Sequence, residues 1–273
     1  MTKVKERKAS LGLNWINLKP TENKIKSSMG LEIPYWFWKS DVLNFNKKKA
    51  ISFLLKKEKL IINKYPPSGD GGTGLTDSLT SRYQFYNFLK LKSPELKSLQ
   101  KHIIKNIRMC INKFNGEGKH IPTHDLWIIC WFNVLRKNQK IGQHRHRELW
   151  ETEKSFLSGH LTLQAESTYT YYLSVCEKYA WCIENIPGEL IIFPTYLPHY
   201  TDKTLSKSPR ISVAFDVYDK KELAESTFID RGTCIPINRQ IQDVIKEIIA
   251  KEFEEDTLQT KIHDAKAEVS IAT

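Results

Sequence analysis

The stretch that decides the fold is PGELIIFPTYLPHYTDKTLSKSPRISVAFDV, residues 187–217. It contains two short runs rich in β-branched and aromatic residues, LIIFP and RISVAFDV, with Pro, Asp, Lys and Ser between them. Runs of this length and composition, bounded by turn-forming residues, are typical of strands. The stretch therefore predicts two β-strands joined by a loop.

Runs of the same kind begin at Leu126 and continue up to this stretch. They are LWIICWFNVL, SGHLTLQA, TYTYYLSV and YAWCIEN. Several short strands with turn residues between them indicate an antiparallel sandwich or barrel. We therefore expect a fold that is mostly β with flanking helices: a double-stranded β-helix, which is a jelly-roll or cupin-like barrel, packed by N-terminal and C-terminal helices.

Three segments outside the strands carry helical patterns. Apolar residues predict a helix over about 41–59, and the tripeptide SPE at 93–95 is typical of the cap and first turn of a second helix. Glycines at 116 and 118 are expected to end that second helix. An apolar stripe along 237–253 predicts a C-terminal helix.

These elements fit a single domain over 1–273, with the helices packed against the β core. Within it, 1–125 is expected to be helical or irregular, 126–219 to form the β-helix core, and 220–273 to form the C-terminal helix and tail. A chain of this length is able to bury a substantial hydrophobic core.

The composition is that of a globular protein in a reducing compartment. Apolar residues make up 40% and charged residues 27% of the chain. No apolar run approaches the roughly 20 residues that span a bilayer, and the first residues, MTKVKERKAS, lack the apolar stretch of a secretory signal. The five cysteines form no C-x-x-C pair, so they indicate small buried side chains rather than a zinc site. We expect a cytoplasmic protein without a membrane partner.

The net charge of +11 is concentrated near the N-terminus, where residues 1–65 hold fifteen Lys or Arg and five Asp or Glu. Such an excess is able to attract nucleic acid or another polyanion. However, no nucleic-acid motif accompanies it, and aromatic residues do not alternate regularly with the basic ones. A solvated basic face is therefore the favoured interpretation.

Three histidines fall where the predicted strands could bring them together. In an extended chain His144 and His146 point to the same face with Cα atoms about 6.6 Å apart, while Arg145 points to the other. His199 comes at the end of a strand, after two prolines, which places its imidazole at the rim of a barrel. The three imidazoles are candidate ligands of one metal ion. Glu148 competes with His146 for the third position if the strand continues.

The strand RISVAF carries a second feature of chemical interest. Arg210 and Ser212 share one face of this strand, and the apolar side chains Ile211 and Val213 share the other. An arginine that faces an apolar interior is a costly buried cation unless it meets an anion. A guanidinium beside a hydroxyl suits a carboxylate through charge-assisted hydrogen bonds. The pair is therefore a candidate carboxylate anchor.

Taken together, these residues resemble the site of the Fe(II)- and 2-oxoglutarate-dependent oxygenases. That superfamily carries H-x-D/E on one strand, a distal His on another, and an Arg about ten residues beyond; here Arg210 lies eleven residues after His199. The segments WFNV, HRH, SG, PGELIIFPTYLPH and RISVAFD are similar to those of a group of bacterial and phage 2-oxoglutarate-Fe(II) oxygenases with an H-x-H motif. The likeness covers roughly 65–220 and is strongest over 127–217.

The sequence departs from that group in two places. The stretch RELWETEKSFL, residues 147–157, is longer than the group pattern and is expected to form a substrate loop. SGHLTL replaces S-G-V-Y-Y, which places His160, Thr162 and Gln164 on one strand face. That polar face either lines the cavity or, at His160, faces solvent.

The resemblance implies a non-haem iron oxygenase. His144, His146 and His199 would be the catalytic residues that hold Fe(II), and Arg210, Ser212 and Thr162 would bind the co-substrate 2-oxoglutarate. Its implied activity couples oxidative decarboxylation of 2-oxoglutarate to C–H hydroxylation of an unidentified substrate, a small molecule or a peptide.

Several alternatives remain open at this stage. The same barrel could serve a 2-oxoglutarate halogenase or desaturase, or a three-histidine iron dioxygenase that uses no 2-oxoglutarate. A third alternative is a non-catalytic β-barrel binding module that uses the basic N-terminal region. Trp131 and Asn133, on one face of the preceding strand, could shape the cavity or hold substrate, and packing is an equal interpretation for Trp131.

Overall fold

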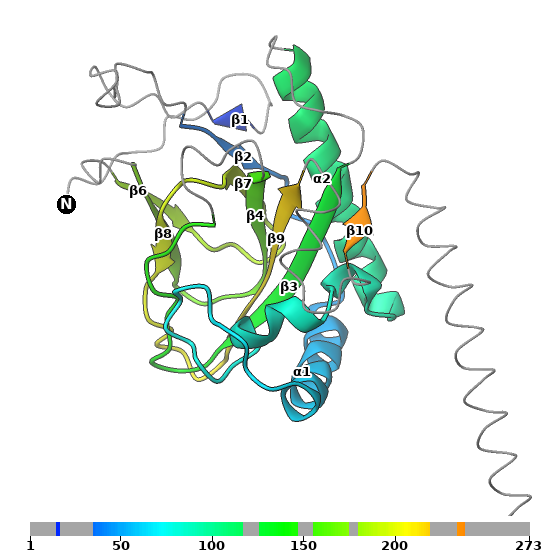
Figure 1. Ribbon diagram of the computed structural model, residues 1–273, viewed down its shortest axis with the longest axis vertical. Coiled ribbons are helices and arrows are strands. Elements are labelled where there is room, and N and C mark those ends of the chain that lie inside the picture. The colour runs from blue at the N-terminus through cyan, green and yellow to red at the C-terminus, as the bar shows by residue number, and fades with distance from the viewer. Residues whose placement is uncertain are drawn as a thin grey trace, which may run out of the picture.

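The structure is a computed structural model that describes residues 15–16, 35–116, 126–146, 155–174, 180–218 and 234–237. Two antiparallel sheets form its β part (Figure 1). In order across the large sheet, the strands are β1 (Trp15–Ile16), β2 (Phe37–Lys39), β7 (Leu190–Pro194), β4 (Ser155–Gln164), β9 (Arg210–Tyr218), β3 (Trp127–Leu135) and β10 (Ile235–Pro236). In order across the small sheet, the strands are β6 (Ala180–Glu184), β5 (Tyr169–Leu173) and β8 (His199–Thr201).

The helices cover one side of the large sheet, and the small sheet lies on its other side (Figure 1). They are α1 (Lys47–Lys64) and α2 (Lys97–Gly116), with short 3-10 turns η1 (Thr80–Phe85), η2 (Phe88–Lys90) and η3 (Pro94–Leu96). Their buried apolar side chains pack with those of β3, β4, β7 and β9 in one large core. A smaller cluster, which includes Phe37, Tyr172 and Phe193, fills part of the space between the sheets.

Strand β9 shows how the sequence pattern divides these two sides. Ile211, Val213 and Phe215 belong to the core beneath the helices. Arg210 and Ser212 line a cavity on the opposite side of the sheet. Because side chains alternate along a strand, the apolar residues anchor the sheet while the polar ones are presented to the cavity.

The two predicted N-terminal helices exist, with different starting points. The first begins at Lys47 rather than near 41, because Asn46 caps it: its side-chain oxygen accepts a hydrogen bond from the Lys49 N–H at 3.1 Å. The second is preceded by the expected Ser93 cap, which accepts from the Glu95 N–H at 3.3 Å. That cap opens the 3-10 turn η3, and α2 follows directly. Of the helices that the structure describes, none has the length and apolar character to cross a membrane.

The mostly β fold with flanking helices is confirmed as two antiparallel sheets with helices. Closure into a double-stranded β-helix and the single-domain division of the chain stay predictions. The expected C-terminal helix over 237–253 lies outside the described residues beyond Ile237. The same holds for 147–154 of the expected substrate loop, while its last residues, 155–157, begin strand β4.

Candidate active site

A cavity of about 260 Å³ lies where the two sheets and the loop before η1 meet. The large sheet contributes residues of β3, β4, β7 and β9, and the small sheet contributes residues of β5 and β8. His144, His146 and His199 line this cavity together with Arg210 and Ser212. The residues that the sequence singled out on separate segments therefore share one cavity.

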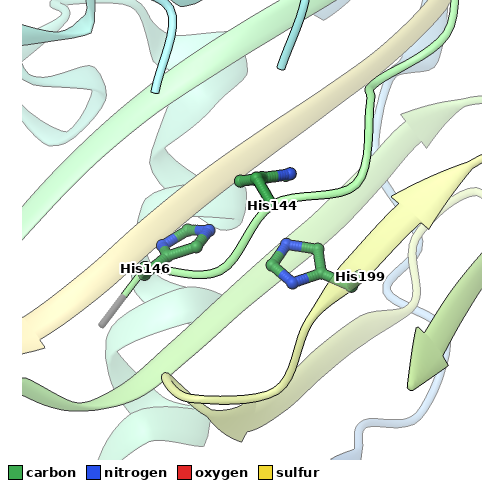
Figure 2. A group of neighbouring side chains, drawn as sticks. All are labelled: His144, His146 and His199. Atoms are coloured by element: carbon green, nitrogen blue, oxygen red, sulfur yellow. The ribbon is translucent and has the colours of Figure 1, made fainter. Parts of the chain in front are cut away.

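Backbone pairing brings the histidines together. The His144 N–H donates to the His199 carbonyl at 3.0 Å, and the His199 N–H donates to the His144 carbonyl at 2.8 Å. This isolated antiparallel bridge joins the loop after β3 to the start of β8. The His146 N–H donates to the Thr195 carbonyl at 3.2 Å, which fixes the other end of the H-x-H segment. Figure 2 shows the three side chains gathered on these two segments.

The three imidazoles are close enough to share one metal ion. One ring nitrogen from each of His144, His146 and His199 can be chosen so that all three lie within 4.8 Å of one another. Ring centroids are 4.3 Å apart for His144 and His199, and 5.1 Å apart for His146 and His199.

Each ring is oriented by a hydrogen bond through Nδ1. The Nδ1 of His144 lies 2.9 Å from the Gly142 carbonyl oxygen, and that of His199 lies 2.9 Å from the Leu197 carbonyl oxygen. Carbonyl oxygens only accept, so both Nδ1 atoms carry the proton and both Nε2 atoms keep a lone pair. A neutral imidazole whose second nitrogen donates to an oxygen is the usual form of a histidine metal ligand.

Burial favours the same neutral form. Desolvation, together with the nearby His146 imidazole, lowers the pKa of His144 to about 4. Desolvation and both neighbouring imidazoles lower the pKa of His199 well below its usual range. Protons therefore compete weakly for these two rings near neutral pH, which fits a metal-binding role.

His146 is oriented differently, by a carboxylate. Its Nδ1 lies 2.5 Å from Oδ1 of Asp216, a residue of β9 that also accepts from the Ser158 hydroxyl at 2.6 Å. Asp216 was not among the residues that the sequence pattern singled out. The available signal was its position on β9, because it shares the cavity-facing side with Arg210 and Ser212.

Arg210 is a buried cation with unused donors. Its side chain extends to the small sheet, where Nη2 lies 3.4 Å from Oγ1 of Thr170 on β5 and 3.2 Å from Oδ1 of Asn185, the residue after β6. Its Nε and Nη1 atoms are buried and have no hydrogen-bond partner. Burial lowers its pKa to about 10, so the guanidinium still carries its charge at neutral pH. Buried donors on a cation are normally satisfied, so this pair of atoms fits a carboxylate entering the cavity.

The remaining sequence candidates fall into two groups. Trp131, Asn133 and His160 line the cavity, so His160 does not face solvent. Thr162 is fully buried as the register partner of Ser212, and it is not among the residues that line the cavity. Gln164 lies outside the cavity as well and donates to the Pro209 carbonyl at 2.7 Å.

The competing ligand Glu148 lies in 147–154, outside the residues that the structure describes. Within the described part, the histidine triad is the cluster of His, Cys, Asp or Glu that could hold a metal ion.

Comparison with known proteins agrees with the chemistry of this cavity. Residues 158–216 match a family model described as "Putative 2OG-Fe(II) oxygenase". The matched segment contains His199 and Arg210, and the H-x-H segment lies just upstream of it. A search of curated proteins finds no match. The matched segment of the chain is therefore similar to the 2OG-Fe(II) oxygenases, which are dioxygenases that depend on Fe(II) and 2-oxoglutarate.

Solved structures with a similar arrangement share little sequence with the chain. A prolyl-4-hydroxylase from Pseudomonas putida is 12% identical with a TM-score of 0.45, over 67% of this chain and 92% of that one. A prolyl hydroxylase from Trichoplax adhaerens, in complex with a hypoxia inducible factor oxygen degradation domain peptide fragment, is 14% identical with a TM-score of 0.44, over 70% and 86%. The viral collagen prolyl hydroxylase of Paramecium Bursaria Chlorella virus-1, as a 2OG complex, is 12% identical with a TM-score of 0.40, over 67% and 94%.

Proposed function

We propose that the protein is an Fe(II)- and 2-oxoglutarate-dependent oxygenase that hydroxylates a C–H bond of an unidentified substrate, a small molecule or a peptide. One observation carries the proposal: three imidazoles whose Nδ1 atoms each contact an oxygen acceptor, and a buried guanidinium with two unpartnered donors, line the same cavity. A metal ion needs the first set, and a carboxylate needs the second.

In this proposal His144, His146 and His199 hold Fe(II) through Nε2. Bound Fe(II) would supply the activation of dioxygen that couples decarboxylation of 2-oxoglutarate to substrate oxidation. Arg210 holds the far carboxylate of 2-oxoglutarate, and Ser212, which lies beside it on the cavity face of β9, is a second contact. Thr162, the register partner of Ser212 on β4, does not line the cavity, so we assign it no direct contact with the co-substrate.

Side chains of β3 and η1 form the part of the cavity wall near His146, where the substrate would bind. The ring centroid of Trp131 lies 6.0 Å from that of His146 and 5.2 Å from that of Tyr83. Asn133 is held by a hydrogen bond from the Thr80 hydroxyl at 2.8 Å. Aromatic walls with a few fixed polar groups are usual for small-molecule sites.

The test is anaerobic reconstitution of the full chain with Fe(II) and 2-oxoglutarate. We expect a weak visible charge-transfer band, and succinate when dioxygen is admitted. His199→Ala should lose both signals, while His102→Gln, a matched change of a histidine in α2 outside the cavity, should keep them. A wild-type protein that binds no iron would rule out the proposal.

The same experiment separates the alternative activities. Iron-dependent oxidation without succinate would indicate a three-histidine dioxygenase that uses no 2-oxoglutarate. Chlorinated product in the presence of chloride would indicate a halogenase. Absence of iron together with a steep salt dependence of polyanion binding would indicate a binding module.

A further inference from the structure

A fourth histidine lies in the cavity without belonging to the metal triad. His160 is on β4, is 9% exposed and lines the cavity. Its Nε2 lies 2.7 Å from the hydroxyl oxygen of Tyr172, and its Nδ1 is buried with no hydrogen-bond partner. A buried polar nitrogen without a partner is uncommon in a folded protein, and here it borders a ligand cavity.

The tautomer of His160 follows from the hydrogen bond with Tyr172. The phenol is fully buried, and desolvation raises its pKa well above the usual range, so it keeps its proton. If the phenol donates to Nε2, its O–H is satisfied and only the Nδ1–H of His160 lacks a partner. In the other tautomer Nε2–H donates to the phenol, which leaves both the Tyr172 proton and the Nδ1 lone pair unpaired. The first arrangement leaves fewer buried groups unsatisfied, so Nδ1 is a donor.

His160 and Arg210 reach across the cavity to the same face of β5. Arg210 contacts Thr170, and His160 contacts Tyr172, two residues further along the strand. Alternate residues of a strand share one face and are about 6.6 Å apart. These two side chains, which line the cavity and interact electrostatically, carry three buried nitrogens without a hydrogen-bond partner: Nε and Nη1 of Arg210, and Nδ1 of His160.

We propose that His160 donates its Nδ1–H to the same carboxylate that Arg210 anchors, and so is a further binding residue for the co-substrate. The inference rests on the proposed function. A carboxylate has two oxygens with about four acceptor sites, enough for a guanidinium fork and one imidazole. His160 is neutral, because desolvation and the charge of Arg210 lower its pKa to about 3. The pocket thus offers one positive charge and an additional neutral donor to one carboxylate.

Tyr172 is a positioning residue in this arrangement, because it acts only by fixing which nitrogen of His160 carries the proton. The group of oxygenases that the sequence resembles has Val at the position of His160, in S-G-V-Y-Y. His160 is therefore a departure of this chain from that pattern.

The test compares ligands with and without the far carboxylate. 2-Oxoglutarate and oxalate both chelate a metal ion, but oxalate is too short to reach Arg210 as well. Each is titrated calorimetrically, without dioxygen, into the full chain loaded with Mn(II). We expect His160→Leu to weaken 2-oxoglutarate about 10- to 150-fold, as for a lost hydrogen bond to a charged group, and to leave oxalate unchanged.

Two substitutions control for the position of the donor. The side-chain amide nitrogen of Asn occupies the place of Nδ1, and that of Gln lies nearer to Nε2. His160→Asn should therefore recover part of the lost affinity, and His160→Gln should not. Tyr172→Phe frees the tautomer without removing the imidazole, so it should weaken 2-oxoglutarate only about two- to tenfold.

Equal 2-oxoglutarate affinity in wild type, His160→Leu and His160→Gln would overturn the inference while leaving the proposed function intact. Equal weakening of 2-oxoglutarate and oxalate would also overturn it, because His160 would then support the metal or the cavity shape. If the wild type binds Mn(II) but not 2-oxoglutarate, both the proposed function and the inference about His160 fail. Circular dichroism checks the fold, and if His160→Leu does not fold, the Asn, Gln and Phe variants decide.

Discussion

Nδ1 of His146 lies 2.5 Å from Oδ1 of Asp216, and this contact places a carboxylate directly behind the H-x-H segment. The superfamily pattern has a carboxylate at the position that His146 occupies. Here the carboxylate belongs to Asp216 of β9, which contacts the imidazole of His146. It accepts a hydrogen bond from the Ser158 hydroxyl at 2.6 Å. A carboxylate that accepts from a metal-binding imidazole orients the ring and makes it a stronger ligand.

We therefore expect Asp216→Asn to weaken Fe(II) retention about 10- to 100-fold, the usual effect of losing such a carboxylate. The amide oxygen of Asn still accepts from Nδ1–H, so the loss should be smaller than that of Asp216→Ala. Competition with a chelator under anaerobic conditions measures the effect. Asp77→Asn, whose exposed carboxylate pairs with Arg82 outside the cavity, is the matched control. Identical retention in the Asp216 and Asp77 variants would contradict the prediction.

Arg210 is predicted to anchor the co-substrate and not the metal. Arg210→Ala removes a charge-assisted contact, so 2-oxoglutarate should bind about 10- to 150-fold more weakly, with iron occupancy nearly intact. Arg210→Lys keeps the charge but loses the planar fork, and should give an intermediate affinity. Calorimetry and metal analysis on the same samples separate the two effects. Loss of iron in proportion to the loss of co-substrate would show the assignment to be wrong.

The neutral histidines of the cavity, His160 buried and His144 half-buried, should make the metal-free protein sensitive to acid. Burial lowers the pKa of His144 to about 4 and that of His160 to about 3. Between these values and the ordinary value near 6.5, the unfolded chain binds protons that the folded chain does not. Stability is therefore complete above about pH 6.5 and declines as the pH falls.

His160 alone should account for about 2 kcal/mol of unfolding free energy between pH 6.5 and pH 5. Urea denaturation of the metal-free protein at several pH values measures this dependence. His160→Gln removes one titrating group, so its unfolding free energy should fall less steeply with acid. The same slope in both proteins would contradict the folded-state pKa of His160.

The alternating pattern of the sequence was enough to predict that Arg210 and Ser212 face the cavity, but it did not predict that Thr162 lies outside it. Side chains alternate along any strand, so the RISVAF segment alone places Arg210 and Ser212 opposite the core. The H-x-H pair depends on the same local rule. The contacts that orient these residues could not be predicted in this way. Asp216 meets His146 only because the loop after β3 pairs with the start of β8, which is tertiary information.

The His160–Tyr172 pair was missed for the same reason. Tyr172 is twelve residues away in sequence, and the large and small sheets must face each other before the two side chains meet. The predicted start of α1, near residue 41, was wrong for a different reason. The apolar pattern extends before Lys47, and only the side-chain cap at Asn46 determines where the helix begins.

Gly159 is predicted to be required for the packing of β4 between β7 and β9. A Cβ there would lie 2.7 Å from the Ile191 carbonyl oxygen and would also collide with the ring of Phe215. Gly159→Ala should destabilise the protein by about 1–3 kcal/mol, the usual cost of overpacking. Gly69→Ala, in a loop where a Cβ would meet nothing within 4 Å, is the control. Thermal unfolding of the two variants tests this, and equal midpoints would contradict it.

The last prediction concerns the third metal ligand, for which His146 and Glu148 compete. His146 lines the cavity. Its imidazole contacts the carboxylate of Asp216, and its backbone N–H donates to the Thr195 carbonyl. With three neutral imidazoles, Fe(II) keeps both positive charges, and Asp216 offsets one of them from behind the ligands. Binding of the 2-oxoglutarate dianion beside Arg210 then brings the net charge of the site to zero. Iron contributes two positive charges and Arg210 one, while Asp216 contributes one negative charge and 2-oxoglutarate two. A further carboxylate ligand at Glu148 would leave this water-poor cavity with a net negative charge, which is unfavourable at low dielectric.

We therefore expect His146→Ala to lose iron and turnover, and Glu148→Ala to keep both. Because the co-substrate neutralises a cationic site, 2-oxoglutarate should also slow the loss of iron to a chelator in the wild type. Bound iron, succinate formation and chelator competition, measured on both variants, test the choice. The reverse result, with full iron and turnover in His146→Ala and neither in Glu148→Ala, would mean that the site is a two-histidine, one-carboxylate triad.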